Sequence, residues 1–527
     1  MISSSSQRSH LLRVPCYFSP MLAVIIFLGL VLRIHQLTDR SLWFDEAFSW
    51  RLIQFPFLEM LQRVGLDNHP PLYFILLKVW AAIFSDSALA LRSLSILFGG
   101  LTIFGTYLFA LEAFGKDLLP AGTNDGLQPH GRGIGLLAAG LVALSAFHIR
   151  YSQELRMYTM AATLAVFSSW ALFRALQPPS RLGRWLLYGL FALLLAYTHY
   201  YGLFTLAAQA VFIAALILVR ARWSLPQVIR DPGLRHALFT AAIASVLWLP
   251  WLPAFLRQRS QVQATFWSHP TTRWDIALLC YNMFTVRCDY YTPPYQRQLL
   301  AADASILILW LLRRKAGAAE CYVLGSIVLP LICCLTVSAP IALRYFIMAH
   351  VFLLVGLSVV IWRVPFRLER SIVIAVILAF FAGLYIDYWH DLDVAHRPGA
   401  RGAAAFLEQQ RRPEEPVIIC LPAFYFPLLY YTPHRASCYL YSDGRPMPHF
   451  YGTAAMIPED LITDEQMHGL GSHRVWIVNI AGGLFGAYSV PVPPQWKVKS
   501  HHSFTEVGWL GDIIVMEYET DTVHEDN

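Results

Sequence analysis

Long apolar runs separated by short polar loops follow one another from residue 18 to residue 388. Each run approaches the roughly 20 apolar residues that a helix needs to cross a bilayer core of about 30 Å. The pattern therefore predicts a polytopic helical bundle with about eleven crossings. The expected spans are 18–37, 89–113, 133–150, 153–175, 184–198, 201–220, 236–256, 299–313, 320–339, 344–362 and 371–388. No small-residue cleavage site follows the first run, so we expect a retained helix rather than a cleaved signal.

The apolar stretch at 71–85 is shorter than the others, and its placement decides the topology. A stretch of this length is as typical of an interfacial or re-entrant helix as of a crossing. We place it, as a juxtamembrane helix, in a first external loop that runs from residue 38 to residue 88. The basic loops at 174–184, 220–235, 313–315 and 363–370 then all lie on the cytoplasmic side with the N-terminus. This topology predicts a multi-pass protein of the inner (plasma) membrane whose C-terminus is periplasmic or extracellular.

Beyond residue 388 the pattern changes to charged runs, frequent prolines and short β-branched or aromatic stretches. We expect a helix near 401–411 and strands near 416–421, 437–442, 473–480 and 509–518. The chain should therefore have two parts, a transmembrane domain at 1–388 and a small soluble α/β domain at 389–527. The second part contains no phosphate loop or catalytic triad, so we expect it to cover the membrane site or to bind an acceptor.

Composition agrees with a membrane protein, because 56% of the residues are apolar and only 14% are charged. The basic residues behind the net charge of +6 lie largely in the loops, so the charge does not indicate nucleic acid as a partner. The eight cysteines show no metal-ligand spacing. Two pairs, Cys280 with Cys288 and Cys420 with Cys438, are expected outside the membrane. An oxidising compartment would permit disulfides there, although the sequence does not establish the pairing.

Acidic and basic side chains gather where the predicted loops meet the external face. Asp45 and Glu46 form the first acidic pair after the first span, and Glu154 and Arg156 stand at the start of another. Ionisable groups at the edge of a bilayer are costly and usually face a bundle interior or a water-filled cavity. The pair Asp45 and Glu46 could bind a divalent cation, but no further ligand set is evident. We therefore expect a reaction that needs neither metal nor cofactor.

Six short motifs occur in a characteristic order along the chain. They are Trp43-Phe44-Asp45-Glu46, His69-Pro70-Pro71-Leu72-Tyr73, Leu91-Arg92-Ser93-Leu94-Ser95, Ser152-Gln153-Glu154-Leu155-Arg156-Met157-Tyr158, Thr198-His199-Tyr200-Tyr201 and Arg344-Tyr345-Phe346. This ordered set resembles the bacterial branch of the protein O-mannosyltransferase and aminoarabinose transferase superfamily (glycosyltransferase family 39-like), over residues 15–390. These are membrane glycosyltransferases of the GT-C fold. The chain departs from the pattern at Leu155, where the family often has Ala, and at His350, where it often has Pro.

The resemblance implies transfer of a sugar from a polyprenyl monophosphate donor to an acceptor on the external face, with inversion at the anomeric carbon. Asp45 is our candidate for the base that accepts the proton of the attacking hydroxyl. Lys78 and Arg344 are candidates for binding the phosphate that leaves with negative charge. Glu154 could orient the acceptor, as a second catalytic residue, or hold Arg156. Further candidates for substrate contact are Glu46, His69, Arg92, Tyr151, Gln153, Arg156, Tyr158, His199, Tyr200 and Tyr345.

Each of these residues also has a purely structural interpretation. The acidic pair could cap a helix N-terminus, and Lys78 or Arg344 could anchor the chain at the headgroups. His69 could only shape a turn before proline, Glu154 and Arg156 could pair between helices, and His199 could be a buried core histidine. The function itself has an alternative, a lipid or solute transporter or flippase, for which paired charges near mid-membrane and an internal repeat are typical. The acceptor could be a protein, a glycan or a lipid.

Overall fold

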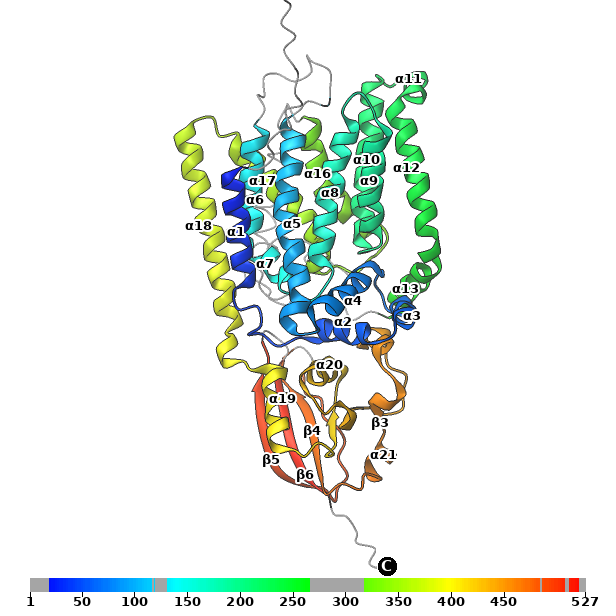
Figure 1. Cartoon of the computed structure of the whole chain (residues 1–527), viewed down its shortest axis with the longest axis vertical. Coiled ribbons are helices and arrows are strands. Elements are labelled where there is room, and N and C mark those ends of the chain that lie inside the picture. Colours follow the sequence, from blue (N-terminus) through cyan, green and yellow to red (C-terminus); the bar gives the residue numbers. More distant parts are fainter. Residues whose placement is uncertain are drawn as a thin grey trace, which may run out of the picture.

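The computed structural model describes residues 19–115, 118, 130–265, 317–483, 486–507 and 511–520. It consists of a helical bundle, a layer of short helices at one end of the bundle, and a mixed sheet below that layer (Figure 1). The bundle is made of α1 (Pro20–Ile34), α5 (Ala88–Gly115), α6 (Gly131–Leu144), α7 (Ala146–Ser152), α8 (Tyr158–Leu176), α9 (Leu182–Ala196), α10 (Tyr201–Arg220), α11 (Leu225–Arg230), α12 (Pro232–Trp248), α13 (Leu252–Ala264), α16 (Ala318–Thr336), α17 (Ile347–Trp362) and α18 (Arg367–Leu392).

Within the described ranges, seven helical segments are long and apolar enough to cross a membrane, or eight if the bent pair α6 and α7 counts as one. Helices α1 and α9 are shorter but run alongside these spans in Figure 1. The predicted span at 299–313 lies outside the described residues. The mainly helical membrane bundle is therefore confirmed, whereas the count of eleven crossings stays a prediction.

A bend of 61° separates α6 from α7, where the sequence predicted one straight span. Arg33 of α1 is fully buried in this break. Its guanidinium donates to the carbonyls of Val142 and Ala143, both at 3.0 Å, and to Ser152 Oγ at 3.0 Å. The last carbonyls of a helix lack partners within the helix, so a cation from a neighbouring helix stabilises this end of α6.

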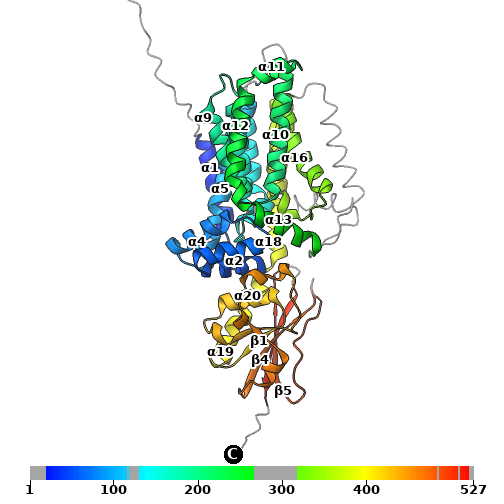
Figure 2. The ribbon, with the colours of Figure 1, turned by 90° about the vertical axis from the view of Figure 1, so that its right-hand side faces the viewer.

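Three short helices form the layer between the bundle and the sheet (Figure 2). They are α2 (Phe44–Gln54), α3 (Phe57–Leu66) and α4 (Leu72–Phe84). Helix α4 has 13 residues, which span about 20 Å and fall short of the bilayer core. Helix α2 begins where Glu46 folds back to accept a hydrogen bond from the backbone N–H of Trp43. This layer positions Asp45 at the end of the bundle.

The C-terminal part is a six-stranded mixed sheet with helices, as the predicted α/β unit requires. Its strand order is β3-β2-β1-β4-β6-β5, with parallel pairing from β3 to β4 and antiparallel pairing of β6 with β4 and β5. The elements are α19 (Gly399–Gln410), β1 (Val417–Ile419), α20 (Pro422–Tyr431), β2 (Cys438–Tyr441), β3 (Leu461–Ile462), α21 (Asp464–His468), β4 (Arg474–Ala481), β5 (Lys497–Thr505) and β6 (Asp512–Glu519). The sequence missed α20, β3, α21 and β5. Strand β5 is mostly exposed, so it shows little apolar alternation.

The disulfide between Cys420 and Cys438, which the sequence left open, is not formed, because both thiols are free. Cys438 pairs with Val417 in the parallel register of β1 and β2, three residues before Cys420. Three residues of strand span about 10 Å, whereas the Cα atoms of a disulfide lie within about 7 Å. The other suggested pair, Cys280 and Cys288, lies outside the described residues.

Candidate active site

Asp45 lies in the first turn of α2, between two arginines from distant parts of the chain. Its Oδ2 atom is 3.9 Å from Arg156 Nε and 3.9 Å from Arg344 NH2. Both separations exceed hydrogen-bond length. Because the carboxylate side chain is 17% exposed, an incoming group can reach it. The arrangement is an accessible carboxylate flanked by two fixed cations, and both arginines come from the predicted motifs.

Glu46, the neighbouring acid, faces the protein interior instead. Its carboxylate accepts hydrogen bonds from Arg92 Nε at 2.8 Å and Arg92 NH2 at 2.6 Å, and a third from the backbone N–H of Leu155 at 2.9 Å. Burial acts to raise the pKa of Glu46, but the Arg92 guanidinium outweighs it and holds that pKa below its usual value. Both side chains are essentially inaccessible. Glu46 and Arg92 therefore form a buried ion pair that fixes α2 to α5, and in this conformation neither side chain is accessible for the substrate contact that the sequence predicted.

His69 is oriented by an acidic residue that the sequence analysis missed. Asp67 Oδ2 lies 2.9 Å from His69 Nδ1, and Arg156 NH2 lies 3.1 Å from His69 Nε2. Because a guanidinium only donates, Nε2 accepts, so the ring proton sits on Nδ1 and is donated to Asp67. Burial and the nearby Arg156 lower the pKa of His69. The sequence signal that could have indicated Asp67 is its position two residues before His69, which precedes two prolines.

Arg156 connects these groups, but Glu154 does not hold it. The Arg156 guanidinium also donates to Ser49 Oγ at 3.1 Å and to the Asp45 carbonyl at 3.3 Å. The Glu154 side chain instead lies 3.4 Å from Arg150 Nε. Its Oε2 atom is buried without a hydrogen-bond partner in the described part of the chain, and burial raises its pKa. With only 2% of its surface exposed, Glu154 is a buried neighbour of the site rather than a group that substrate reaches in this conformation.

Lys78 also has a different position from the one expected. Its ammonium donates to the carbonyls of Ile53 and Phe55, at 2.7 and 2.8 Å, and so caps the C-terminal end of α2. Eight residues of helix separate Ile53 from Asp45, a rise of about 12 Å. Lys78 therefore does not share a phosphate site with Arg344. Gln153 has a structural role too, because its amide donates to the carbonyls of Arg33 and His35.

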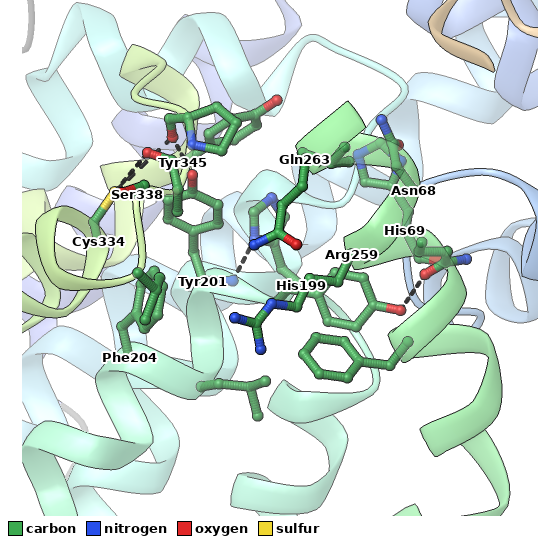
Figure 3. Close-up of a pocket in the computed structure, with 18 of the residues that line it drawn as sticks. Asn68, His69, His199, Tyr201, Phe204, Arg259, Gln263, Cys334, Ser338 and Tyr345 are labelled. Carbon is green, nitrogen blue, oxygen red and sulfur yellow. Dashed lines mark hydrogen bonds between the residues drawn. The ribbon is translucent and has the colours of Figure 1, made fainter. Parts of the chain in front are cut away.

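A pocket of about 690 Å³ is lined in part by His69 and Tyr345. Figure 3 shows Arg259 and Gln263 of α13 in this pocket together with His199 and Tyr201, at the start of α10. The pocket is lined by Asn68, His69, His199, Tyr200, Tyr201, Leu203, Phe204, Phe255, Gln258, Arg259, Val262, Gln263, Cys334, Leu335, Val337, Ser338, Ala339, Pro340 and Tyr345. His69, bonded to Arg156, and Tyr345, next to Arg344, connect it to the Asp45 carboxylate. One part of the lining is polar and aromatic, the other apolar.

Several predicted residues meet in or beside this pocket. The His199 ring lies 5.5 Å from the Tyr345 ring and 5.9 Å from the Tyr158 ring, and Tyr158 packs edge-on against Tyr151. The Tyr200 hydroxyl donates to Gln258 and accepts from Trp251. The sequence missed Arg259 and Gln263, because polar residues on an exposed helix face carry no distinct signal.

His199 presents an unused donor to the pocket. Its Nδ1 accepts the backbone N–H of Tyr201 at 3.2 Å. Burial, and then the neighbouring His69 ring and Arg156 guanidinium, lower the pKa of His199 well below the usual value, so the ring is neutral and its proton sits on Nε2. That atom is buried and has no partner among the described residues. A buried donor without a partner indicates a place for a ligand oxygen.

No His, Cys, Asp or Glu side chains of the described ranges gather in groups of three as metal ligands would. The groups at the Asp45 site are two arginine cations, a carboxylate and the imidazoles of His69 and His199, which can bind a ligand and transfer protons.

Comparison with known proteins identifies the fold. No protein-family model and no curated protein matches the sequence. Among solved structures, ArnT from Cupriavidus metallidurans in the apo state matches with a TM-score of 0.59 and 14% identity, over 94% of this chain and 97% of that chain. The same protein bound to undecaprenyl phosphate matches with a TM-score of 0.57, 14% identity and the same coverage. The likeness extends over nearly the whole of both chains, and it confirms the architecture that the motifs predicted: the chain has the GT-C fold.

Proposed function

We propose that the chain is an integral membrane glycosyltransferase that moves a sugar from a polyprenyl monophosphate to an acceptor hydroxyl on the external membrane face. The observation that carries the proposal is the accessible Asp45 carboxylate between Arg156 and Arg344, beside a pocket at the end of a GT-C bundle. The similar structure of ArnT contains undecaprenyl phosphate, a lipid of the donor class. The acceptor hydroxyl belongs to a protein, a glycan or a lipid.

Asp45 acts as the general base in this reaction. It takes the proton of the acceptor hydroxyl while the hydroxyl oxygen forms a bond to the anomeric carbon. The bond from that carbon to the phosphate oxygen breaks on the opposite face, and its electron pair leaves with the polyprenyl phosphate. The configuration at the anomeric carbon is therefore inverted. Arg344, at 3.9 Å from Asp45, is near enough to stabilise the charge that develops on the phosphate.

The pocket suits the head of the donor. Its volume of about 690 Å³ lies within the roughly 300–1,000 Å³ typical of small-molecule sites. His199 Nε2 can donate to a phosphate or sugar oxygen, and the exposed Arg259 supplies the cation that Lys78 does not. The apolar part of the lining, with Leu335 and Val337, can hold the first isoprene units.

The test is transfer by the detergent-purified protein from a panel of radiolabelled polyprenyl-phosphate sugars, with membrane extract as acceptor. Asp45→Asn is compared with Asp39→Asn, an exposed acid of the same loop. We expect one donor to be turned over, and the Asp45 variant to be at least about 100-fold slower while the Asp39 variant is unaffected. The same assay with a chelator tests the metal-independent reaction. No turnover of any donor would contradict the proposal and favour the transporter alternative.

A further inference from the structure

The C-terminal part of the chain holds the outer face of α2, the helix that carries Asp45. Figures 1 and 2 both show α20 directly beneath α2. The Phe426 ring of α20 lies 6.0 Å from the Phe44 ring and 6.2 Å from the Phe48 ring, measured between centroids. Gly452 closes this contact, because a Cβ atom there would come within 3.1 Å of all three rings. Phe44 directly precedes Asp45, so this packing acts on the turn that carries the carboxylate.

An ion pair holds the same face one turn further along. Arg51 NH2 lies 3.2 Å from Asp460 Oδ1. Asp460 is itself fixed within the C-terminal part, because it accepts from the Tyr425 hydroxyl at 2.8 Å and from the backbone N–H of Ile457 at 2.9 Å. Asp460 is 7% exposed, so solvent screens the pair only in part. The pair therefore connects α2 to a rigid point rather than to a mobile side chain.

Further contacts secure the chain on either side of α2. Arg401 donates to the carbonyls of Thr38 and Asp39 before the helix, at 2.8 and 2.9 Å. Arg63 donates to the carbonyls of Ala454 and Met456 after it, both at 3.0 Å. A helix of 11 residues is marginal alone in water, so the position of α2 depends on such contacts.

Helix geometry explains what these contacts fix. At about 100° per residue, Phe44, Phe48 and Arg51 lie within one stripe of about 60° on α2. Glu46, bound to Arg92, points to nearly the opposite side. Asp45 lies between these two sides, about 90° from the middle of the stripe and about 100° from Glu46. Rotation of α2 would therefore swing Asp45 away from Arg156 and Arg344, and the contacts on the two opposite faces prevent it.

We propose that Tyr425, Phe426, Gly452 and Asp460 form a clasp that sets the position of Asp45, with Asp460 and Arg51 as positioning residues for the reaction. This inference rests on the proposed function. The clasp does not line the donor pocket, whose residues come from other elements. Loss of the clasp should therefore lower kcat and leave the KM for the donor unchanged. A displacement of about 1 Å can slow a reaction up to about 100-fold.

The experiment compares Arg51→Met, Asp460→Asn and the double variant, with Arg51→Lys as the conservative variant. Arg474→Met is the matched control, because Arg474 pairs with Glu415 and Glu517, which both belong to the C-terminal part of the chain and not to α2. We expect each single variant to lower kcat about tenfold at constant KM, the double variant to be no worse than the worse single variant, and Arg51→Lys and Arg474→Met to remain near wild type. A change in KM alone, or an equal loss in Arg474→Met, would overturn the clasp.

Hydrogen exchange of the α2 amides tests the clasp without any turnover. We expect faster exchange at residues 47–54 in Arg51→Met and Asp460→Asn than in the wild type or Arg474→Met. Unchanged exchange would refute the clasp even if activity fell. Absence of turnover in the wild type, with faster exchange in these variants, would instead contradict the proposed function and leave the clasp standing as a structural device.

Discussion

Glu46→Gln should destabilise the protein, whereas Asp45→Asn should not, although the two acids are adjacent. The Gln variant leaves the Arg92 guanidinium buried without its counter-charge. Breaking a buried ion pair in this way costs about 3–5 kcal/mol. Arg92 keeps its hydrogen bonds to the carbonyls of Leu37, Arg40 and Ser41, so we expect the lower end, about 3 kcal/mol. This corresponds to a change of roughly 100-fold in the unfolding equilibrium.

The assay is denaturant unfolding of the protein in detergent, followed by tryptophan fluorescence, with Arg92→Met and the double variant completing a cycle. Because the pKa of Glu46 is held below its usual value, the stability that the pair contributes is fully present above that usual value, near 4.5. It is lost as the pH falls through the lowered pKa. This acid-dependent loss should be smaller in Glu46→Gln. If Glu46→Gln kept wild-type stability and lost turnover, Glu46 would act in the chemistry and the structural role would be refuted.

Two other substitutions test hydrogen-bonding groups for which the described residues show no alternative partner. His199→Phe removes the Nε2 hydrogen-bond donor but keeps an aromatic ring. We expect the KM for the sugar donor to rise about tenfold or more, as for the loss of a hydrogen bond to a charged group. An unchanged KM would show that the Nε2 proton meets no ligand. Arg33→Met leaves the carbonyls of Val142 and Ala143 unpaired at the α6 break, and each such group costs about 1–3 kcal/mol. Thermal unfolding should show this loss, and a melting temperature equal to that of the wild type would contradict the role of Arg33.

The sequence was sufficient to predict the membrane bundle, because a bilayer imposes long apolar runs that are visible without any knowledge of contacts. The predicted topology also places Asp45, Arg156 and Arg344 at the same end of the bundle, and in the structure the two arginines lie beside Asp45. The break between α6 and α7 was not predictable in this way. It is stabilised by Arg33, which lies more than a hundred residues from the carbonyls that it binds.

Roles within the site depended on side-chain directions that spacing along the chain does not give. Glu154 and Arg156 are two residues apart in a turn before α8, so their side chains point to different partners. The position of Lys78 near the expected membrane surface predicts a phosphate ligand. In the structure its ammonium instead donates to two carbonyls at the end of α2. For Asp67 the sequence offers only its position two residues before His69, and the contact between the two side chains shows which atoms pair.

The adjacent acids Asp45 and Glu46 show why the proposed base and the residue that supports its helix can be neighbours in sequence. On a helix, consecutive side chains diverge by about 100°, so both cannot face the same partner. Glu46 takes the inward direction and its charge is neutralised by Arg92, which fixes one face of α2. The Asp45 side chain points to a different side of α2, where it stays accessible between two arginines at the end of the bundle. A substitution that exchanged the two, Asp45→Glu with Glu46→Asp, would keep the net charge but shorten the inner acid by one methylene. The inner pair with Arg92 would then lengthen, and we expect both stability and turnover to fall; retention of both would show that the chemistry does not depend on this division of roles.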